Sequence, residues 1–432
     1  MRHPRLGTPH RTSLPRLATF VVIPAAVAAL AASGPSGPAV ATGSSGTSPR
    51  LVGRAVLPVD TLAAGPPAGA FVVPGEGTVN GVDFPLPSQP VEGFSSIVDG
   101  RSPGELLAMP DNGFGSKKNS PDFLIRAYFI RPDFKTARGG SGSVAVGDHI
   151  SFSDPDHKFG FPIVNERSTD RLLTGSDIDP ESLQRGRDGD LWVGDEFGPW
   201  ILHFDANGRL LDPPYSVPGI MSPNNPALQG ATATQPNSRG FEAMAISPNR
   251  KFLYAALEGA TVADPDQTRR NIYEFSTTDH AFTGRELHYR TEAPTNLVAD
   301  MGALGGHRLV VIERDAGSGL NARFRRVYAV DLRDSDAHGF LRKTSLVDLA
   351  AIPDPDLISL PAVHPGDVGL GDPFSVTCES VEAIHVVRGH RILVGCDNNL
   401  PNSGRNPGLA DDNEFILVDL PRGGDHAEVA GP

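Results

Sequence analysis

Short apolar runs separated by turn residues recur along this chain, while the i, i+3, i+4 spacing of an amphipathic helix is weak throughout. Glycine and proline together account for 88 of the 432 residues, and they interrupt nearly every window long enough for a helix. The apolar residues are 39% of the chain and are gathered into these short runs. The pattern predicts an all-β chain of short strands joined by turns.

The expected strands follow one another in a constant order. Each unit begins with a short first strand, continues through a turn with glycine or asparagine, and reaches a second apolar strand that ends near a carboxylate. A third strand follows in most units. The first strands lie at 93–97, 179–183, 240–244, 298–301 and 380–384. The second strands lie at 106–109, 191–193, 252–257, 309–312 and 392–394, and the third at 124–130, 201–204, 272–275, 327–330 and 415–418.

A repeated unit of three or four short antiparallel strands is typical of a β-propeller blade. Five units are recognisable, and the wide intervals 97–181 and 301–382 could each conceal another. Residues 51–90 contain further strands, at 71–73 and 79–84, that could close the ring against the C-terminal strand. We therefore predict a β-propeller of six blades, within a range of five to seven. A pair of β-sandwiches is the alternative, but it does not explain the repeated order.

The first 41 residues are typical of a secretory signal peptide. Four arginines precede a nearly continuous apolar run at 17–32, and Ala39-Val40-Ala41 matches a cleavage site. We expect a flexible linker at 42–50, one propeller domain at 51–432, and secretion of the mature protein. An uncleaved membrane anchor is the alternative, although about sixteen apolar residues are few for a membrane span.

Charge narrows the choice of partners. Loss of residues 1–41 would leave 34 basic and 51 acidic side chains, a formal charge of −17. Such a surface repels nucleic acid and anionic membranes and attracts cations. We expect no nucleic-acid partner, no membrane contact after cleavage, and a monomer.

The chain has two cysteines, Cys378 and Cys396, and export would permit a disulfide between them. They flank an expected hairpin that turns near Gly389. If that turn is symmetric, Cys396 faces Glu382, and Cys378 lies about 13 Å away, whereas a disulfide tolerates a Cα separation of about 7 Å. A disulfide therefore requires the chain to bend before Glu382. Buried free thiols are the alternative.

Acidic residues recur at corresponding places in the units. The inner-strand candidates are Glu181, Glu242, Asp300 and Glu382. In a propeller the inner strands line a central channel, so residues at equivalent positions converge on one opening. Crowded carboxylates repel one another unless cations bind or some of the carboxylates become protonated. Ca²⁺ is the cation we expect, because it accepts six to eight oxygen ligands in flexible geometry. The alternative role for each acid is to hydrogen-bond a neighbouring blade or cap a strand.

The candidate site combines these acids with nearby arginines. The predicted metal ligands are Asp111, Glu181, Asp195, Glu196, Glu242, Glu258, Asp300, Glu313, Glu382 and Asp397. Arg239 precedes one inner strand, and Arg314 follows Glu313 directly. Guanidinium groups beside metal-bound carboxylates suit a phosphate monoester, which they bind bidentately. An ordinary salt bridge is the alternative for each arginine. No G-x-S-x-G, H-E-x-x-H, C-x-x-C or Walker motif is present.

Several segments together resemble the phytase-like family described as "esterase-like activity of phytase". They are MPDNGFG at 109–115, DPESL at 179–183, DLWVGDEFGP at 190–199, GFEAMA at 240–245 and LYAALE at 253–258, and the resemblance extends roughly over residues 90–420. It implies a propeller related to the alkaline phytases, which hydrolyse phosphate esters with calcium ions bridging enzyme and substrate. The lysine- and aspartate-rich substrate motifs of those phytases are not recognisable here.

The same resemblance implies roles for particular residues. The acids would be metal ligands, Glu181 and Glu242 would act in catalysis, and Arg239 and Arg314 would hold phosphate. We therefore expect a secreted, calcium-dependent hydrolase of small phosphate esters or esters. A non-catalytic propeller that binds a ligand or a cell surface is one alternative, and a single-metal lactonase or carboxylesterase is another.

Overall fold

The repeated units fold into blades of four antiparallel strands in a computed structural model, which describes residues 48–387 and 390–421. The expected signal peptide lies outside these residues. Blade 1 contains β6 (Phe94–Asp99), β7 (Leu106–Pro110), β8 (Arg126–Asp133) and β9 (Ser143–Ser151). Blade 2 contains β10 (Pro180–Arg185), β11 (Leu191–Asp195), β12 (Trp200–Phe204) and β13 (Tyr215–Ser216). Blade 3 contains β14 (Phe241–Ile246), β15 (Phe252–Leu257), β16 (Arg269–Ser276) and β17 (Ala281–Arg290).

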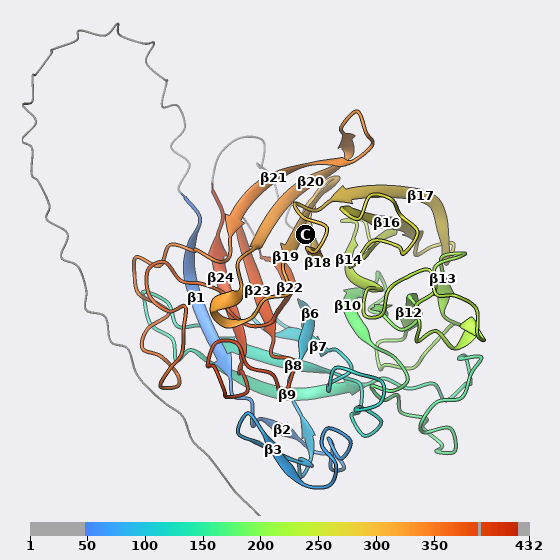
Figure 1. The fold of residues 1–432 in the computed structure, drawn as a ribbon, viewed down its shortest axis with the longest axis horizontal. Helices are drawn as coiled ribbons and strands as arrows, with labels where there is room; N and C mark the ends of the chain where they lie inside the picture. The colour runs from blue at the N-terminus through green and yellow to red at the C-terminus, as the bar shows by residue number, and fades with distance from the viewer. Residues whose placement is uncertain (1–47, 388–389, 422–432) are drawn as a thin grey trace, which may run out of the picture. The chain divides into compact units, whose positions relative to one another are not determined.

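The remaining two blades complete the ring (Figure 1). Blade 4 contains β18 (Leu297–Gly305), β19 (Arg308–Arg314), β20 (Arg325–Ser335) and β21 (Leu341–Asp348). Blade 5 contains β22 (Ser380–Val387), β23 (Arg391–Asp397), β24 (Asn413–Asp419) and β1 (Arg50–Leu57). Each inner strand (β6, β10, β14, β18 or β22) contacts the inner strands of both neighbouring blades. The prediction of a β-propeller is therefore confirmed.

Blade number and ring closure differ in detail from the sequence prediction. The described residues form five blades, the lower end of the predicted range, and not six. The intervals 97–181 and 301–382 hold the outer strands of blades 1 and 4 and long loops rather than extra blades. The ring closes through β1, which pairs with β24 over Arg50–Leu57. Residues 79–84 belong instead to a separate hairpin of β3 (Gly77–Val79) and β4 (Val82–Phe84).

Each inner strand contains a β-bulge at the same place in its pairing with the second strand. The extra residues are Ser95, Glu181, Glu242, Ala299 and Glu382. A bulge leaves its extra residue without a partner opposite and re-aims the side chain. The five bulges therefore place one residue of each blade at the same end of the central channel.

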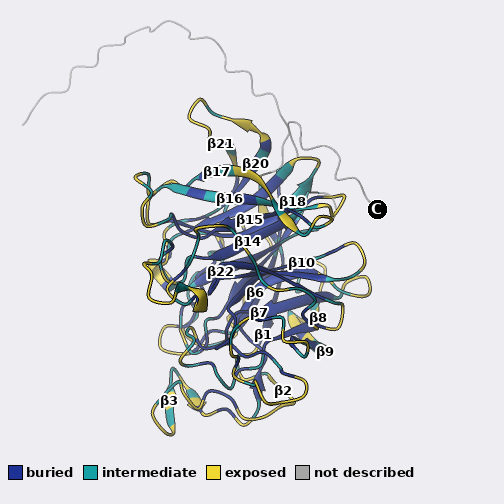
Figure 2. Cartoon of the chain, turned by 90° about the vertical axis from the view of Figure 1, so that its right-hand side faces the viewer, coloured by how far each residue is buried: buried dark blue, intermediate teal, exposed yellow. Residues whose placement is uncertain are grey.

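Apolar side chains between adjacent blades hold the ring together. Five buried clusters correspond to the five junctions between blades. Trp192 and Phe275, for example, lie at the junction of blades 2 and 3. Figure 2 shows the buried inner strands surrounded by exposed outer loops. A channel formed by strands packed on both faces is rigid, which suits a site assembled from every blade.

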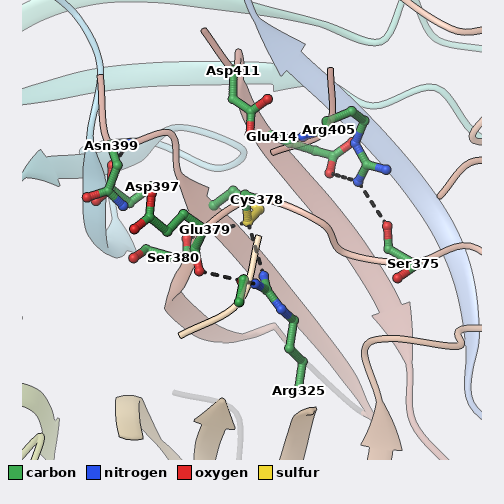
Figure 3. Close-up of a disulfide and its surroundings, with 12 residues drawn as sticks. Arg325, Ser375, Cys378, Glu379, Ser380, Asp397, Asn399, Arg405, Asp411 and Glu414 are labelled. Atoms are coloured by element: carbon green, nitrogen blue, oxygen red, sulfur yellow. Dashed lines mark hydrogen bonds and ion pairs between the residues drawn. A yellow bond between two sulfur atoms is a disulfide. The ribbon is translucent and has the colours of Figure 1, made fainter. Parts of the chain in front are cut away.

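The two cysteines form a disulfide, with their Cα atoms 6.1 Å apart (Figure 3). Cys396 pairs with Val381 in the sheet rather than with Glu382, because Glu382 is the bulged residue. The chain bends at residues 378 and 379, before β22 begins. This is the bend that the sequence argument required. Arg325 lies against the bond, with Nη1 3.8 Å from the Sγ atom of Cys378.

Helical structure in the described residues is confined to two short 3₁₀ turns, Pro226–Leu228 and Gly319–Asn321. Within these same residues, neither turn has the length and apolar character needed to span a bilayer.

Candidate metal and substrate site

A polar cavity of about 230 Å³ opens at the end of the channel where the bulges lie. Nine acidic residues and two arginines line it. The acids are Asp111, Asp179, Glu181, Glu196, Glu242, Glu258, Glu379, Glu382 and Asp397, and the arginines are Arg239 and Arg314. Such a net negative cavity attracts cations and repels anions.

Seven of the nine acids come from two positions of the repeated unit, and Asp179 and Glu379 precede inner strands. The first position is the bulged residue of the inner strand, which supplies Glu181, Glu242 and Glu382. The second position lies at the end of the second strand. It is the residue directly after the one that pairs with the inner strand just before the bulge. It is occupied by Asp111, Glu196, Glu258, Arg314 and Asp397. All five second-position residues line the cavity.

Blade 4 departs from this pattern at both positions. Its bulged residue is Ala299, and its second position carries Arg314 instead of an acid. The guanidinium Nη2 of Arg314 donates to Glu258 Oε1 at 3.2 Å and also to Glu382 Oε1. Blade 4 therefore contributes a cation to the ring where its neighbours contribute carboxylates.

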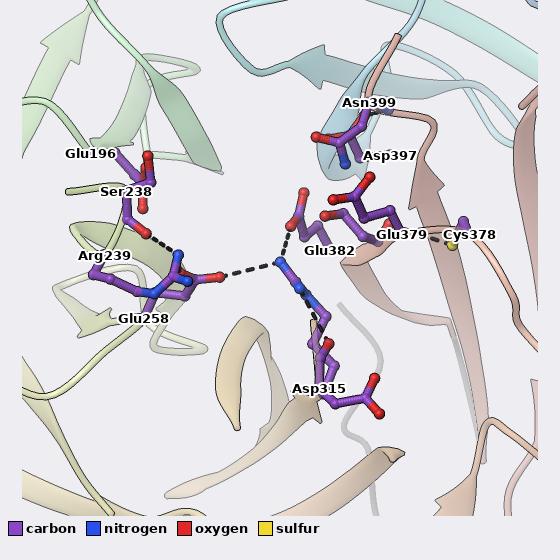
Figure 4. A network of polar contacts seen from close by, with 12 residues as sticks. Glu196, Ser238, Arg239, Glu258, Asp315, Cys378, Glu379, Glu382, Asp397 and Asn399 are labelled. Carbon is purple, nitrogen blue, oxygen red and sulfur yellow. Dashed lines mark hydrogen bonds and ion pairs between the residues drawn. The ribbon is translucent and has the colours of Figure 1, made fainter. Parts of the chain in front are cut away.

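Glu258 accepts hydrogen bonds from two arginines, Arg314 and the Arg239 labelled beside it in Figure 4. Arg239 Nη1 donates to its Oε2 atom at 2.7 Å, on the side opposite Arg314. The two guanidinium groups differ in access, because the Arg239 side chain is 34% exposed and the Arg314 side chain is 6% exposed. Arg239 can contact a molecule in the cavity, whereas Arg314 is buried and forms ion pairs with two glutamates.

Close approach of blades 2 and 3 at the rim depends on one glycine. Gly240 donates its amide to Glu196 Oε1 at 3.1 Å. A Cβ atom on Gly240 would lie 2.5 Å from the Cα atom of Glu196, which is closer than two such atoms can approach. The glycine therefore allows Glu196 to reach the cavity beside the Glu242 strand.

The carboxylates form three groups in which ligand oxygens lie within 4.8 Å of one another. The groups are Asp111–Asp179–Glu181, Glu181–Glu196–Glu242 and Glu242–Glu258–Glu382. Glu181 and Glu242 each belong to two groups, so these two side chains could bridge adjacent cations. In the third group, Arg314 already supplies positive charge to Glu258 and Glu382. The first two groups are thus the better candidates for metal ions.

Burial and crowding perturb the titration of these acids. Burial raises the pKa of Glu181 well above its usual range, and the charge of Glu242 raises it further. Burial likewise raises the pKa of Glu242, with a further contribution from Glu258. For Arg314, burial alone would lower the pKa, but Glu382 and Glu258 raise it above its ordinary value. Without a cation, the cluster therefore favours partial protonation of its carboxyl groups.

Asp179 belongs to the site although the sequence reasoning did not include it among the ligands. It is buried, and its Oδ1 atom has no hydrogen-bond partner. Burial raises the pKa of this carboxyl group to about 6. An unpaired buried carboxylate oxygen among other carboxylates fits a hard divalent cation, which takes oxygen ligands only. The donor set of the first two groups therefore fits Ca²⁺.

Three of the predicted ligands lie outside the cavity, because adjacent strand residues face opposite sides. Asp195 accepts hydrogen bonds from the amides of Asp179 at 2.9 Å and Gly198 at 2.5 Å, which fixes the loop beside Glu196. Glu313 accepts from Tyr289, Asn296 and Lys343, each at 2.8 Å. At these two strand ends, the side chains that line the cavity are those of the next residues, Glu196 and Arg314.

Asp300 is the third predicted ligand that lies elsewhere. It comes one residue after the bulge, and its Oδ2 atom accepts the amide of Ile384 in blade 5 at 2.8 Å. Ser96 occupies the equivalent place in blade 1, where its Oγ accepts the amide of Leu183 in blade 2 at 2.9 Å. Asp300 therefore ties two inner strands together. This is the alternative role that the sequence analysis left open for such acids.

The fold and the site define a propeller whose central cavity is lined with carboxylates. The chain belongs to the phytase-like family, described as "esterase-like activity of phytase", whose model matches residues 89–400. An uncharacterized secreted protein of Arthroderma benhamiae is 26% identical over an alignment of 133 positions that covers 27% of this chain. The matched part spans 26% of that fungal protein's length.

Several solved structures are also similar to the chain. A luciferin-regenerating enzyme is 12% identical at a TM-score of 0.34, covering 77% of this chain and 79% of its own. A family-43 β-1,3-galactosidase is 10% identical at a TM-score of 0.40, covering 77% and 57%. A PQQ-bound aldose sugar dehydrogenase from Streptomyces coelicolor is 11% identical at a TM-score of 0.32, covering 86% and 100%. These likenesses carry no information on activity.

Proposed function

We propose that this protein is a secreted, calcium-dependent hydrolase of small phosphate esters. Membership of the phytase-like family supports a propeller enzyme. The apolar segment at 17–32 and the secreted fungal relative support export. The observation that carries the proposal is the arrangement of two carboxylate groups that share Glu181 beside an accessible arginine, Arg239.

The charge of the cavity determines how a phosphate ester could bind. Nine acids against two arginines would repel a phosphate group, so binding requires cations between the carboxylates and the substrate. Asp111, Asp179 and Glu181 would hold one Ca²⁺, and Glu196 and Glu242 would hold a second together with Glu181. Bound calcium would neutralise phosphate charge and make an attacking water more acidic.

The chain's own residues would perform the other tasks. Arg239 is exposed enough to donate to a phosphate oxygen while its Nη1 atom still contacts Glu258. Arg314 would not contact the substrate. Its ion pairs with Glu258 and Glu382 would hold these two side chains in position.

The proposal is tested by the release of phosphate from a panel of phosphomonoesters, phosphodiesters, carboxyl esters and lactones, with calcium and with a chelator. We expect phosphate release that requires calcium. Glu242→Gln removes one of the shared ligands and should reduce this activity by at least about 100-fold, because metal ions supply several kcal/mol of charge stabilisation. Glu76→Gln is the matched control. It removes an exposed glutamate that does not line the cavity, and it should retain activity.

Two results would contradict the proposal. Hydrolysis of lactones or carboxyl esters alone would favour the esterase alternative. A lack of hydrolysis across the panel, with calcium still raising the melting temperature of the wild type but not of Glu242→Gln, would assign the cavity to structure or ligand binding.

A further inference from the structure

A second cluster of metal-ligating side chains lies outside the cavity, at the junction of blades 2 and 3. It contains His203 on β12, Asp212 in the loop between β12 and β13, and His280 in the turn between β16 and β17. Their ligand atoms all lie within 4.8 Å of one another. None of the three lines the carboxylate cavity. Unlike that cavity, this cluster offers two imidazole nitrogens and one carboxylate.

The three ligand atoms converge around the carboxylate. His203 Nδ1 lies 2.8 Å from Asp212 Oδ2, and His280 Nδ1 lies 3.4 Å from the same oxygen. The hydroxyl of Tyr215, on β13, lies 3.2 Å from His280 Nδ1. In a tetrahedral zinc site with bonds of about 2.0–2.1 Å, neighbouring ligand atoms are about 3.3 Å apart. The two spacings from Asp212 are therefore close to those of a coordination shell, and the ligand nitrogens of the two histidines lie within 4.8 Å of each other.

The orientation of His203 is set by its other contacts. Its ring is stacked on Trp192, with the ring centres 3.9 Å apart and the planes 7° from parallel. Its Nε2 atom lies 3.0 Å from Asp190 Oδ2, and that oxygen also accepts from Trp192 Nε1 at 2.7 Å. A metal-ligating histidine usually has a carboxylate on its second ring nitrogen, which orients the ring and increases its basicity. Asp190 occupies that place here.

We propose that His203, Asp212 and His280 bind one zinc ion, which clamps the β12–β13 loop of blade 2 to the β16–β17 turn of blade 3. Imidazole nitrogens suit Zn²⁺, whereas Ca²⁺ takes oxygen ligands, so the two sites would select different metals. Three protein ligands leave one coordination position open. The open position is accessible, because the side chains of Asp212 and His280 are 31% and 40% exposed.

The open coordination position lies beside a second cavity. It has a volume of about 520 Å³ and is lined by His280, Tyr215, Tyr273 and Phe282 among others. Tyr215 could complete the shell, or a small molecule with an oxygen donor could reach the metal from this cavity. The zinc site thus combines a clamp between blades with a place for a ligand.

The test is a calorimetric titration of the full chain with Zn²⁺. Excess calcium is present throughout to keep the carboxylate cavity filled. We expect about one tightly bound Zn²⁺ per chain, and a visible absorption band typical of nitrogen ligands when Co²⁺ replaces it. His280→Gln and Asp212→Asn alter partly exposed side chains and should leave the fold intact. Each should weaken Zn²⁺ binding by more than about 100-fold, since loss of an outer-shell partner alone weakens it 10- to 100-fold.

Two matched controls separate this site from other places where zinc could bind. His364→Gln removes a similarly exposed histidine that pairs with Asp412 at 2.8 Å but belongs to none of the metal-ligating groups among residues 48–387 and 390–421. Glu242→Gln alters the carboxylate cavity. Both controls should bind Zn²⁺ as the wild type does. The proposal is overturned if the wild type binds no Zn²⁺ in excess calcium, or if His280→Gln binds it with unchanged affinity.

Discussion

Replacement of Asp300 by alanine tests whether this buried acid ties blades together or holds a metal. The side chain is 2% exposed, and its two oxygens accept the amides of Met301 at 2.7 Å and Ile384 at 2.8 Å. Alanine removes both acceptors and leaves the two donors buried and unpaired. The matched variant is Ser96→Ala, which removes the equivalent contact to Leu183 in blade 1.

The expected loss follows from the number of orphaned donors. Each buried unsatisfied donor costs about 1–3 kcal/mol, so Asp300→Ala should lower the free energy of unfolding by about 2–6 kcal/mol. Ser96→Ala orphans a single donor and should lower it by about 1–3 kcal/mol. Calcium should raise the melting temperature of both variants as much as it raises that of the wild type, because neither side chain lines the cavity.

The assay is urea unfolding in chelator, together with melting curves recorded with and without calcium. A structural role for Asp300 is excluded if Asp300→Ala loses the calcium-dependent rise in melting temperature while its stability in chelator stays at the wild-type level. That result would make Asp300 a metal ligand. Equal, small losses in both variants would show that the contacts between inner strands contribute little.

Three further predictions concern charge and covalent structure. In chelator, the free energy of unfolding should fall as the pH rises from about 4 to 7, because burial raises the pKa of Asp179 to about 6 and of Asp195 to about 7. Stability from such raised values is fully present below about pH 4 and is lost above the folded pKa. Urea unfolding at a series of pH values would show this, and a flat profile would contradict it. Arg314→Met should destabilise the protein by about 3–5 kcal/mol in chelator, since it leaves the buried Glu382 without its cation and Glu258 with Arg239 alone, and calcium should restore part of that loss in the same unfolding assay. Serine in place of both Cys378 and Cys396 should lower stability by about 3 kcal/mol for a loop of 18 residues, and reductant should lower the wild type to the same level.

Much of the fold was predictable because strand order repeats locally. Each first, second and third strand lies where a short apolar run ends at a turn, so neighbouring residues in the chain specify it. The number of blades was not predictable in the same way. A long interval such as 301–382 can hold either a blade or a loop of similar composition, and only packing against neighbours distinguishes them. The strand that closes the ring, β1, pairs with a strand more than 350 residues later.

In the candidate site, too, some residues were predictable from the sequence and others were not. The predicted inner-strand acids lie 14, 16, 13 and 15 residues before the acids predicted at the ends of the second strands, as Glu181 lies before Asp195. The two cavity positions of each blade, such as Glu181 and Glu196 or Ala299 and Arg314, are always 15 or 16 residues apart. A requirement for constant spacing would have selected Glu196 over Asp195.

The convergence of acids at one end of a propeller channel could be inferred from the sequence alone, because the repeated unit places them at equivalent strand ends. Which member of each adjacent pair faces the cavity depends on the folded blade. In a strand, successive side chains point to opposite faces, and one bulged residue shifts that alternation. Glu313 and Arg314 are neighbours in the chain, yet one is buried among Tyr289 and Lys343 while the other supplies the cation of the carboxylate ring. Pairing between strands, which depends on the whole blade, sets that choice.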